Sequence, residues 1–174
     1  VKAYDKANNL AQTQVVFSIN RKDSTYHLSA EASKLEGAYL KSVSEISLQE
    51  INLSKVPEDK AEIIIMRNNQ ETTLSYKDYE REETMTKEGW CEYTYRIHER
   101  YLQEEGAYHI GIRSRDEVNN QKNSLSDHQV GLRFVVDHTA PLGIFLNTKS
   151  KENIYQQKHN IIMKIDDSMG VESI

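Results

Sequence analysis

The chain has 174 residues, enough for one or two small domains with a buried hydrophobic core. Its mild net charge of −5 excludes the clustered Lys and Arg that nucleic acid or an acidic lipid surface requires, so we expect neither as a partner. The single cysteine, Cys91, excludes an intramolecular disulfide and a cysteine-based zinc site within one chain.

The first 21 residues, VKAYDKANNLAQTQVVFSINR, repeat a pattern that returns near residue 112. The motif Asp-x-x-Asn-Asn at residues 5–9 matches the same motif at residues 116–120, an offset of 111. Downstream, Phe17–Asn20 matches Phe134–Asp137 with an offset of 117. Similarity at a domain-sized spacing, with the length difference confined to a loop, indicates tandem modules.

The next segment, up to residue 60, is the hardest to interpret. A weak alternation from Ser24 to Ala30 favours a strand, and Ala30–Glu36 predicts a helical turn that Gly37 ends. The stretch Ile46–Leu53 alternates and then changes phase between Leu48 and Ile51, which predicts a bulge or a strand break.

A hairpin follows. The apolar run AEIIIMR at residues 61–67 predicts a strand that is buried on both faces. Asn68 and Asn69 predict a tight turn, because Asn tolerates a positive φ, and Gln70–Leu74 is the return strand. The charged stretch at residues 75–87 is interpreted as a loop or a short helix.

Three further segments complete this pattern. Trp90–Ile97 alternates, with Cys91, Tyr93, Tyr95 and Ile97 on one face. From Gly106 a second strand places Tyr108, Ile110 and Ile112 on one face, and a polar turn follows at residues 116–123. Leu132–Val136 is the next strand, and residues 137–141 end the pairing.

Strands separated by polar turns predict an all-β, antiparallel sandwich. Two more strands are expected after Pro141, within residues 142–146 and 161–166. We therefore expect three parts: residues 1–21 as the closing strands of a preceding module, residues 22–139 as one complete module, and residues 140–174 as the opening strands of a following module.

Four motifs resemble bacterial immunoglobulin-like repeats of large Gram-positive cell-surface proteins. They are GWCEYTYRI at residues 89–97, EGAYHI at 105–110, the Asp-x-x-Asn-Asn turn, and FVVDHTAP at 134–141. The resemblance implies an immunoglobulin-like or fibronectin III-like sandwich, and it covers the second half of the chain best. Asn119 stands where the family has Gly, and Cys91 stands where it has an aromatic residue.

Oxygen ligands for Ca²⁺ are present in the turn, at Asp116, Asn119 and Asn120, and at the junction, at Asp137. The spacing is not that of an EF-hand loop. We favour turns in which Asp accepts backbone N–H bonds, and we expect no metal and no other cofactor.

Aromatic rings give the only candidates for ligand contact. Trp90, Tyr93 and Tyr95 are weak candidates for a sugar-stacking platform, but in a regular strand Trp90 and Tyr93 point to opposite faces. A core position near a sheet end is the favoured interpretation. Scattered histidines and solvated carboxylate pairs give no catalytic constellation, so we expect no enzyme.

The resemblance implies a non-catalytic spacer or presentation module of a bacterial surface or secreted protein. The alternatives are an adhesin module that binds a glycan or a host protein, and an accessory domain of a large secreted hydrolase. Expected partners are neighbouring modules of the same chain, and self-association through unpaired terminal strands is a further expectation.

Location follows from the resemblance alone, which implies the cell surface or the extracellular space. The longest apolar runs are far shorter than the roughly 20 residues of a membrane-spanning helix, so no membrane segment is expected. No signal-peptide pattern follows Val1, but the chain has the character of an excised piece, so this does not indicate the cytoplasm.

Overall fold

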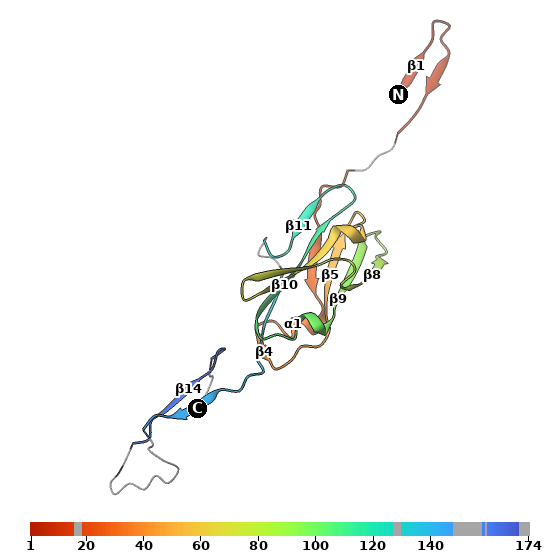
Figure 1. Ribbon diagram of the computed structural model, residues 1–174. Helices are drawn as coiled ribbons and strands as arrows, with labels where there is room; N and C mark the ends of the chain where they lie inside the picture. Colours follow the sequence, from red (N-terminus) through yellow and green to blue (C-terminus); the bar gives the residue numbers. More distant parts are fainter. Residues whose placement is uncertain (16–18, 127–129, 148–157, 159, 171–174) are drawn as a thin grey trace.

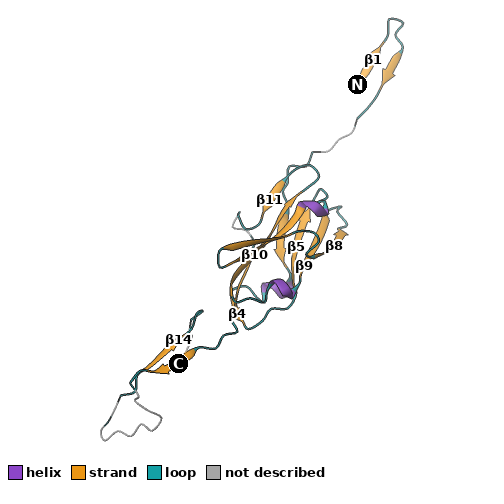
Figure 2. Ribbon diagram, in the orientation of Figure 1, coloured by secondary structure: helices purple, strands orange, loops and turns teal. Residues whose placement is uncertain are grey.

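The computed structural model describes residues 1–15, 19–126, 130–147, 158 and 160–170. Strands make up 46% of the structure and helices 7%, so the predicted all-β class is confirmed. Two large sheets form a central body, and a two-stranded hairpin lies toward each chain end (Figures 1 and 2). Among the described residues, no helix has the length and apolar character needed to cross a membrane.

The first large sheet has four antiparallel strands in the order β3-β5-β9-β8. These strands are β3 (Thr25–Leu28), β5 (Ile46–Asn52), β9 (Cys91–Ile97) and β8 (Glu80–Met85). Along β9 the side chains alternate between buried and half-buried, because successive residues of a strand point to opposite faces. The predicted inward face of this strand is confirmed.

The second large sheet has the order β4-β12-β10-β6-β7, and β11 pairs with the end of β10. All of its pairs are antiparallel except β4 with β12, which run parallel. The strands are β4 (Ala38–Leu40), β6 (Ala61–Arg67), β7 (Gln70–Leu74), β10 (Gly106–Arg115), β11 (Gln121–Asn123) and β12 (Leu132–Val136).

Short helical segments connect the strands. Helix α1 (Ala30–Ser33) begins at Ser29, whose side-chain oxygen accepts the Ala32 N–H, and Gly37 with φ of +73° follows it as predicted. Single 3₁₀ turns at Glu58–Lys60 and Glu99–Tyr101 precede β6 and β10. Asn68 and Asn69 both have positive φ, which confirms the tight β6–β7 turn.

One hydrophobic core joins the two sheets. Leu48, Tyr93 and Tyr95 of the first sheet belong to the same buried cluster as Ile110 and Phe134 of the second. Tyr108 and Phe134 stack with ring centroids 5.1 Å apart. Each fully buried Leu or Ile in such a core contributes roughly 1.5–3 kcal/mol, so this cluster holds the sheets face to face without a disulfide.

The predicted bulge or break in β5 is wrong. The strand pairs with β9 without interruption from Ile46 to Asn52, and Ile46, Leu48, Glu50 and Asn52 are all buried. The alternation therefore never changes phase. A charged side chain occupies an inward position, and its partners are described below.

The predicted loop or short helix at residues 75–87 is also wrong in part. Residues 80–85 form β8, an edge strand of the first sheet that pairs with β9. Its glutamates point to solvent, where charged side chains protect an edge from pairing with another chain. The strand was not predicted because only one of its faces packs against the protein, and its many charged residues leave no alternation of apolar and polar positions.

The two terminal hairpins repeat parts of the central body. Strand β1 (Lys2–Tyr4) pairs with β2 (Leu10–Gln12) in the register in which the end of β10 pairs with β11, displaced by 111 positions. Strand β13 (Leu142–Phe145) pairs with β14 (Met163–Asp166) as β3 pairs with β5. Here the offsets are 117 from residue 28 to 145 and 115 from residue 48 to 163. The hairpins lie at opposite ends of the molecule (Figure 1).

Candidate functional site

The turn after β10 is built around the carboxylate of Asp116. One oxygen accepts the N–H groups of Val118 and Asn120, at 3.0 and 2.8 Å, and the other accepts the Asn120 side-chain amide at 2.9 Å. Asn119 adopts a φ of 66°. The favoured interpretation of this motif as a hydrogen-bonded turn is confirmed, and turn donors occupy both oxygens of Asp116.

The same turn connects β1 and β2. The carboxylate of Asp5 accepts the N–H groups of Ala7 and Asn9 and the Asn9 side-chain amide, and Asn8 has a φ of 67°. Every one of these contacts occupies a position 111 residues before its counterpart. The two Asp-x-x-Asn-Asn motifs are therefore also equal in local structure, whereas residues 17 and 18 of the second match lie outside the described residues.

Asp137, the remaining Ca²⁺ candidate, lies at the other end of β10 from Asp116. Gly106 pairs with Val136, whereas Asp116 follows Arg115, so the ten residues of β10 separate the two carboxylates by roughly 30 Å. Asp137 accepts the Thr139 N–H at 3.2 Å. Within the described residues no group of three His, Cys, Asp or Glu side chains converges as a metal site would require.

The three aromatic candidates do not form one exposed platform. Tyr93 and Tyr95 are fully buried, and the Tyr93 hydroxyl accepts the N–H of Val56 at 2.8 Å. Trp90 is half-buried, with the Lys22 ammonium 5.6 Å from its ring. Cys91 is buried as well, which fits an inert core thiol.

Glu50 lies between the two sheets and is fully buried. The hydroxyls of Ser24 and Ser114 donate to one carboxylate oxygen, and the Tyr95 hydroxyl donates to the other at 2.5 Å. Asn52 in turn donates to Ser24 at 2.9 Å. The network therefore joins β10 of one sheet to β5 and β9 of the other through a charged acceptor, which makes its hydrogen bonds strong.

The second buried charge near this network is Arg81 of β8. Its guanidinium lies 4.0 Å from the centre of the Tyr93 ring, and Nη2 donates to the Val56 carbonyl at 2.6 Å. Nε and Nη1 make no hydrogen bond within the described residues. Burial, followed by the Glu50 charge, raises the pKa of Tyr95 well above its ordinary value, while Arg81 opposes that shift. The Tyr95 hydroxyl therefore keeps its proton and remains a donor.

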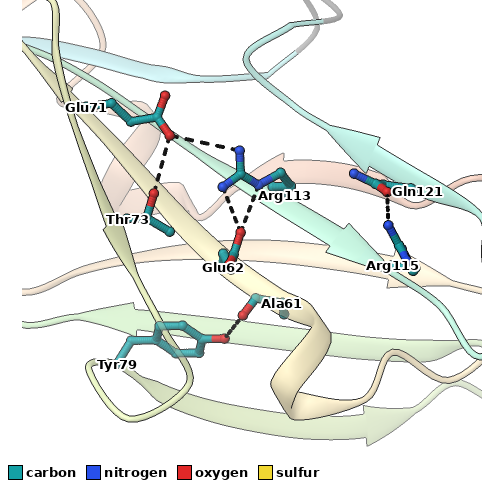
Figure 3. A network of polar contacts seen from close by, with 8 residues as sticks. All are labelled: Ala61, Glu62, Glu71, Thr73, Tyr79, Arg113, Arg115 and Gln121. Carbon is teal, nitrogen blue, oxygen red and sulfur yellow. Dashed lines mark hydrogen bonds and ion pairs between the residues drawn. The ribbon is translucent and has the colours of Figure 1, made fainter.

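Charged side chains lie on the outer face of the second sheet, on strands β6, β7 and β10 (Figure 3). Arg113 of β10 lies between Glu62 of β6, at 2.8 Å, and Glu71 of β7, at 3.9 Å. Arg115 donates to Gln121 of β11 at 2.5 Å. These side chains are solvent-accessible, and such pairs contribute about 0–1 kcal/mol each, so they give solubility more than stability.

Another part of the same face is hollowed. The outer hollow has a volume of about 660 Å³, and it lies across β4, β12, β10 and β6. Tyr39 is 69% exposed at its margin. Among the described residues no carboxylate forms an ion pair with the Arg133 guanidinium. Side chains that line it include Tyr39, Met66, Ala107, His109, Arg133 and Val135.

His109 lines both the outer hollow and a second depression, whose lining includes Ser124, Leu125, Val130 and Gly131. Burial, and then the nearby Arg133 charge, lower the pKa of His109 below its ordinary value of 6.5. The imidazole is therefore neutral at pH 7. The lining of the outer hollow includes one guanidinium, the neutral His109 imidazole, the aromatic residues Tyr39, Tyr108 and Phe134, two Asn residues and apolar side chains, which suits a ligand with both apolar and anionic groups.

Sequence reasoning missed both Glu50 and the outer hollow. For Glu50 the signal was present, because Ile46, Leu48 and Asn52 continue a period of two through residue 50. The outer hollow has no local signal, since four strands that are distant in sequence contribute to it. Comparison with known proteins does not assign the chain: no protein-family model matches it, and no curated protein matches it.

Proposed function

We propose that this chain is a non-catalytic, immunoglobulin-like repeat that acts as a load-bearing spacer in a bacterial surface or secreted protein. The strand orders β3-β5-β9-β8 and β4-β12-β10-β6-β7 support the immunoglobulin-like assignment, since the first corresponds to the ABED sheet and β12-β10-β6-β7 to the GFCC′ part of the other sheet. The repeated turn and the repeated hairpin registers support a tandem array.

The parallel pairing of β4 with β12 carries the mechanical part of the proposal. Strand β4 lies near the start of the central module and β12 at its end, and they pair from Ala38 with Phe134 to Leu40 with Val136. Flanking bonds extend the pair, with Gly37 donating to Arg133 and Asp137 donating to Leu40. Tension on the chain ends slides two parallel strands past each other, so these bonds resist together rather than one after another.

Single-molecule pulling tests the spacer function. With handles at the chain ends, we expect one main unfolding event with a contour gain of roughly 400 Å, the extended length of residues 22–139 at about 3.5 Å each. Handles at Asn69, in the exposed β6–β7 turn, and at the C-terminal end provide the matched control. That geometry peels the edge strand β7 bond by bond, so its unfolding force should be lower. Equal forces in the two geometries would refute the load-bearing role.

The outer hollow supports a second candidate, recognition of a glycan or a host protein. An exposed Tyr39 next to an Arg133 with no ion-pair partner among the described residues is the observation that favours it. A screen against glycans and extracellular-matrix proteins, repeated with Tyr39→Ser and Arg133→Ser, separates the two functions. Binding that both substitutions abolish would establish the adhesin role, and no binding at all leaves the spacer role.

A further inference from the structure

Two linkers, residues 20–22 and residues 137–139, lie at the two ends of the central module, and both contain the same turn. In the first, the side chain of Asn20 accepts the Lys22 N–H at 2.9 Å. In the second, Asp137 accepts the Thr139 N–H at 3.2 Å. The offset is 117 for both positions, so these two linkers are equivalent points in a tandem array.

The central module holds the linker that enters it. The side-chain amide of Asn120 donates to the carbonyls of Asn20 and Lys22, at 3.4 and 3.3 Å. The Asn20 amide donates to the Ser54 hydroxyl at 2.8 Å, and the Lys22 ammonium lies over the Trp90 ring. The turn after β10 thus has a second role, because Asp116 orients the Asn120 amide that contacts the linker.

The module also holds the linker that leaves it, through Glu105. One Glu105 oxygen accepts the His138 N–H at 3.0 Å and the Thr139 hydroxyl at 2.6 Å. The same oxygen lies 2.9 Å from the His138 ring nitrogen. The Asp137 N–H donates to the Leu40 carbonyl at 2.9 Å, which fixes the first residue of this linker to β4.

The two sets of contacts use different backbone groups of the linker. The module before a linker takes N–H groups and the Thr139 hydroxyl. The module after a linker takes carbonyls, the Asn20 side-chain amide and the Lys22 ammonium. No backbone group is needed twice, so one linker can make both backbone sets at once, whereas the side chain at the position shared by Lys22 and Thr139 serves one side only. Asn9 matches Asn120 and makes the same bond to its turn, so the preceding module has the same amide.

We propose that each linker of the array is held from both sides, so that the pole formed by Asn120, Ser54 and Trp90 is a docking surface for the linker that arrives from the preceding copy of this module. The proposal rests on the tandem-spacer function, and it adds which contacts connect one copy of the module to the next. At the second linker, Asp137 replaces Asn20 as the first residue, and Met169 occupies the Ser54 position, since Met169 and Ser54 both donate N–H bonds to the side chain two residues earlier. The second linker therefore lacks both the amide donor of Asn20 and the hydroxyl acceptor of Ser54, so it cannot form this hydrogen bond and its joint should be weaker.

Backbone relaxation measured by NMR on the full chain tests the entering side of the joint. In the unmodified chain we expect order parameters of about 0.85 for residues 20–22, and below about 0.6 in Asn120→Ala. Asn9→Ala is the matched control, because it removes the same turn contact without touching the linker that enters the central module. Ser54→Ala gives a second route to the same loss while leaving the turn intact. Unchanged order at residues 20–22 in both Asn120→Ala and Ser54→Ala would overturn the proposal.

The leaving side is tested with Glu105→Ala, which should release residues 138 and 139 in the same measurement. Glu104→Ala is its control, because that neighbouring carboxylate pairs with Arg67 rather than with the linker. These readings are independent of the pulling experiment. Equal unfolding forces in the two pulling geometries, together with linkers whose order depends on these side chains, would refute the load-bearing spacer alone. A higher unfolding force between the chain ends, together with linker order parameters that the substitutions leave unchanged, would refute the joint alone.

Discussion

At the scale of single residues, the Glu50 carboxylate has three hydroxyl donors and lies in the core between the sheets. Burial removes water from a charged group, and the donors replace it. Such a network adds little net stability when complete, but its members depend strongly on one another, because each lost partner leaves another polar group buried and unpaired.

Substitution of Glu50 by Ala should therefore lower the free energy of unfolding by about 3 kcal/mol, since Ser24, Ser114 and Tyr95 lose their acceptor. Glu71→Ala is the control, because the contacts of this exposed glutamate are long, 3.9 Å to Arg113 and 3.3 Å to the Thr73 hydroxyl, and a change within about 0.5 kcal/mol is expected. Urea unfolding of both variants measures the difference. Similar losses in the two proteins would contradict the role assigned to the network.

A second residue-scale feature is the absence of a side chain at Gly111. A Cβ there would lie 2.5 Å from Leu125 Cδ2, and Ser124 and Leu125 pack directly over this position of β10. Gly111→Ala should displace that segment and cost about 1–3 kcal/mol. Gly143→Ala in β13 should be nearly neutral, because its Cβ would meet only Met163 Sδ at 3.5 Å. Thermal unfolding of both variants tests this, and equal melting temperatures would exclude the packing argument.

At the scale of elements, alternation in the sequence predicted the strands that have one clearly apolar face. Strands β9 and β10 are confirmed with their inward faces, β6 and β12 are confirmed as strands, and the β6–β7 turn is confirmed by two positive φ values. The failures share a cause. In β5 and β8 a charged side chain occupies an inward position, Glu50 or Arg81, and hydrophobicity alone cannot register a charge that is buried with partners.

The candidate sites also divide into those that the sequence could predict and those that it could not. The turn at residues 116–120 could be predicted, because an Asp that accepts nearby N–H groups is a local interaction within five residues. The outer hollow and the contacts of Asn120 with the linker could not, because each joins residues that are distant in sequence. Asn120 and Asn20 are 100 positions apart, and only the pairing of the strands brings them together.

The linker that leaves the module should respond to acid. The Thr139 hydroxyl first, and then the His138 N–H, lower the pKa of Glu105 below its ordinary value of 4.5. Because the folded pKa is depressed, the contact is present above pH 4.5 and is lost as the pH falls through the lowered pKa. NMR titration of the His138 and Thr139 amides should give a midpoint below 4.5, and Thr139→Val should raise it. A midpoint at or above 4.5 in the unmodified chain would contradict the contact.

At the scale of the whole molecule, the hairpins β1–β2 and β13–β14 stand apart from the central body. A compact chain of this length has a radius of gyration of about 16 Å. Small-angle scattering should therefore give a clearly larger value and an elongated distance distribution. A value near 16 Å would show that the hairpins fold back onto the central sheets.

The same hairpins expose large apolar side chains, among them Leu142 at 59% and Phe145 at 56%. Exposed apolar strands of this kind associate, so the self-association predicted from the sequence should be visible as a concentration-dependent mass in sedimentation velocity. Neither hairpin matches residues 57–111 of the central module. Two associating chains would therefore cover the apolar faces of their hairpins without rebuilding a complete module. Leu142→Lys with Phe145→Lys should weaken the association, and a monomer at every concentration would refute it.

Proteins made of similar neighbouring units risk misassembly, in which a strand of one unit completes the next. In the tandem array proposed above, the Glu50 network would act against this error. The hairpin registers place Ala3 at the position of Ser114 and Ile165 at the position of Glu50, so the terminal hairpins do not carry the matching polar groups. Strands exchanged between units would bury Glu50 beside Ala3, or the Tyr95 and Ser114 hydroxyls beside Ile165, at about 1–3 kcal/mol for each group left unpaired. In such an array the buried carboxylate would therefore favour the pairing of each unit's own strands over strands from its neighbour.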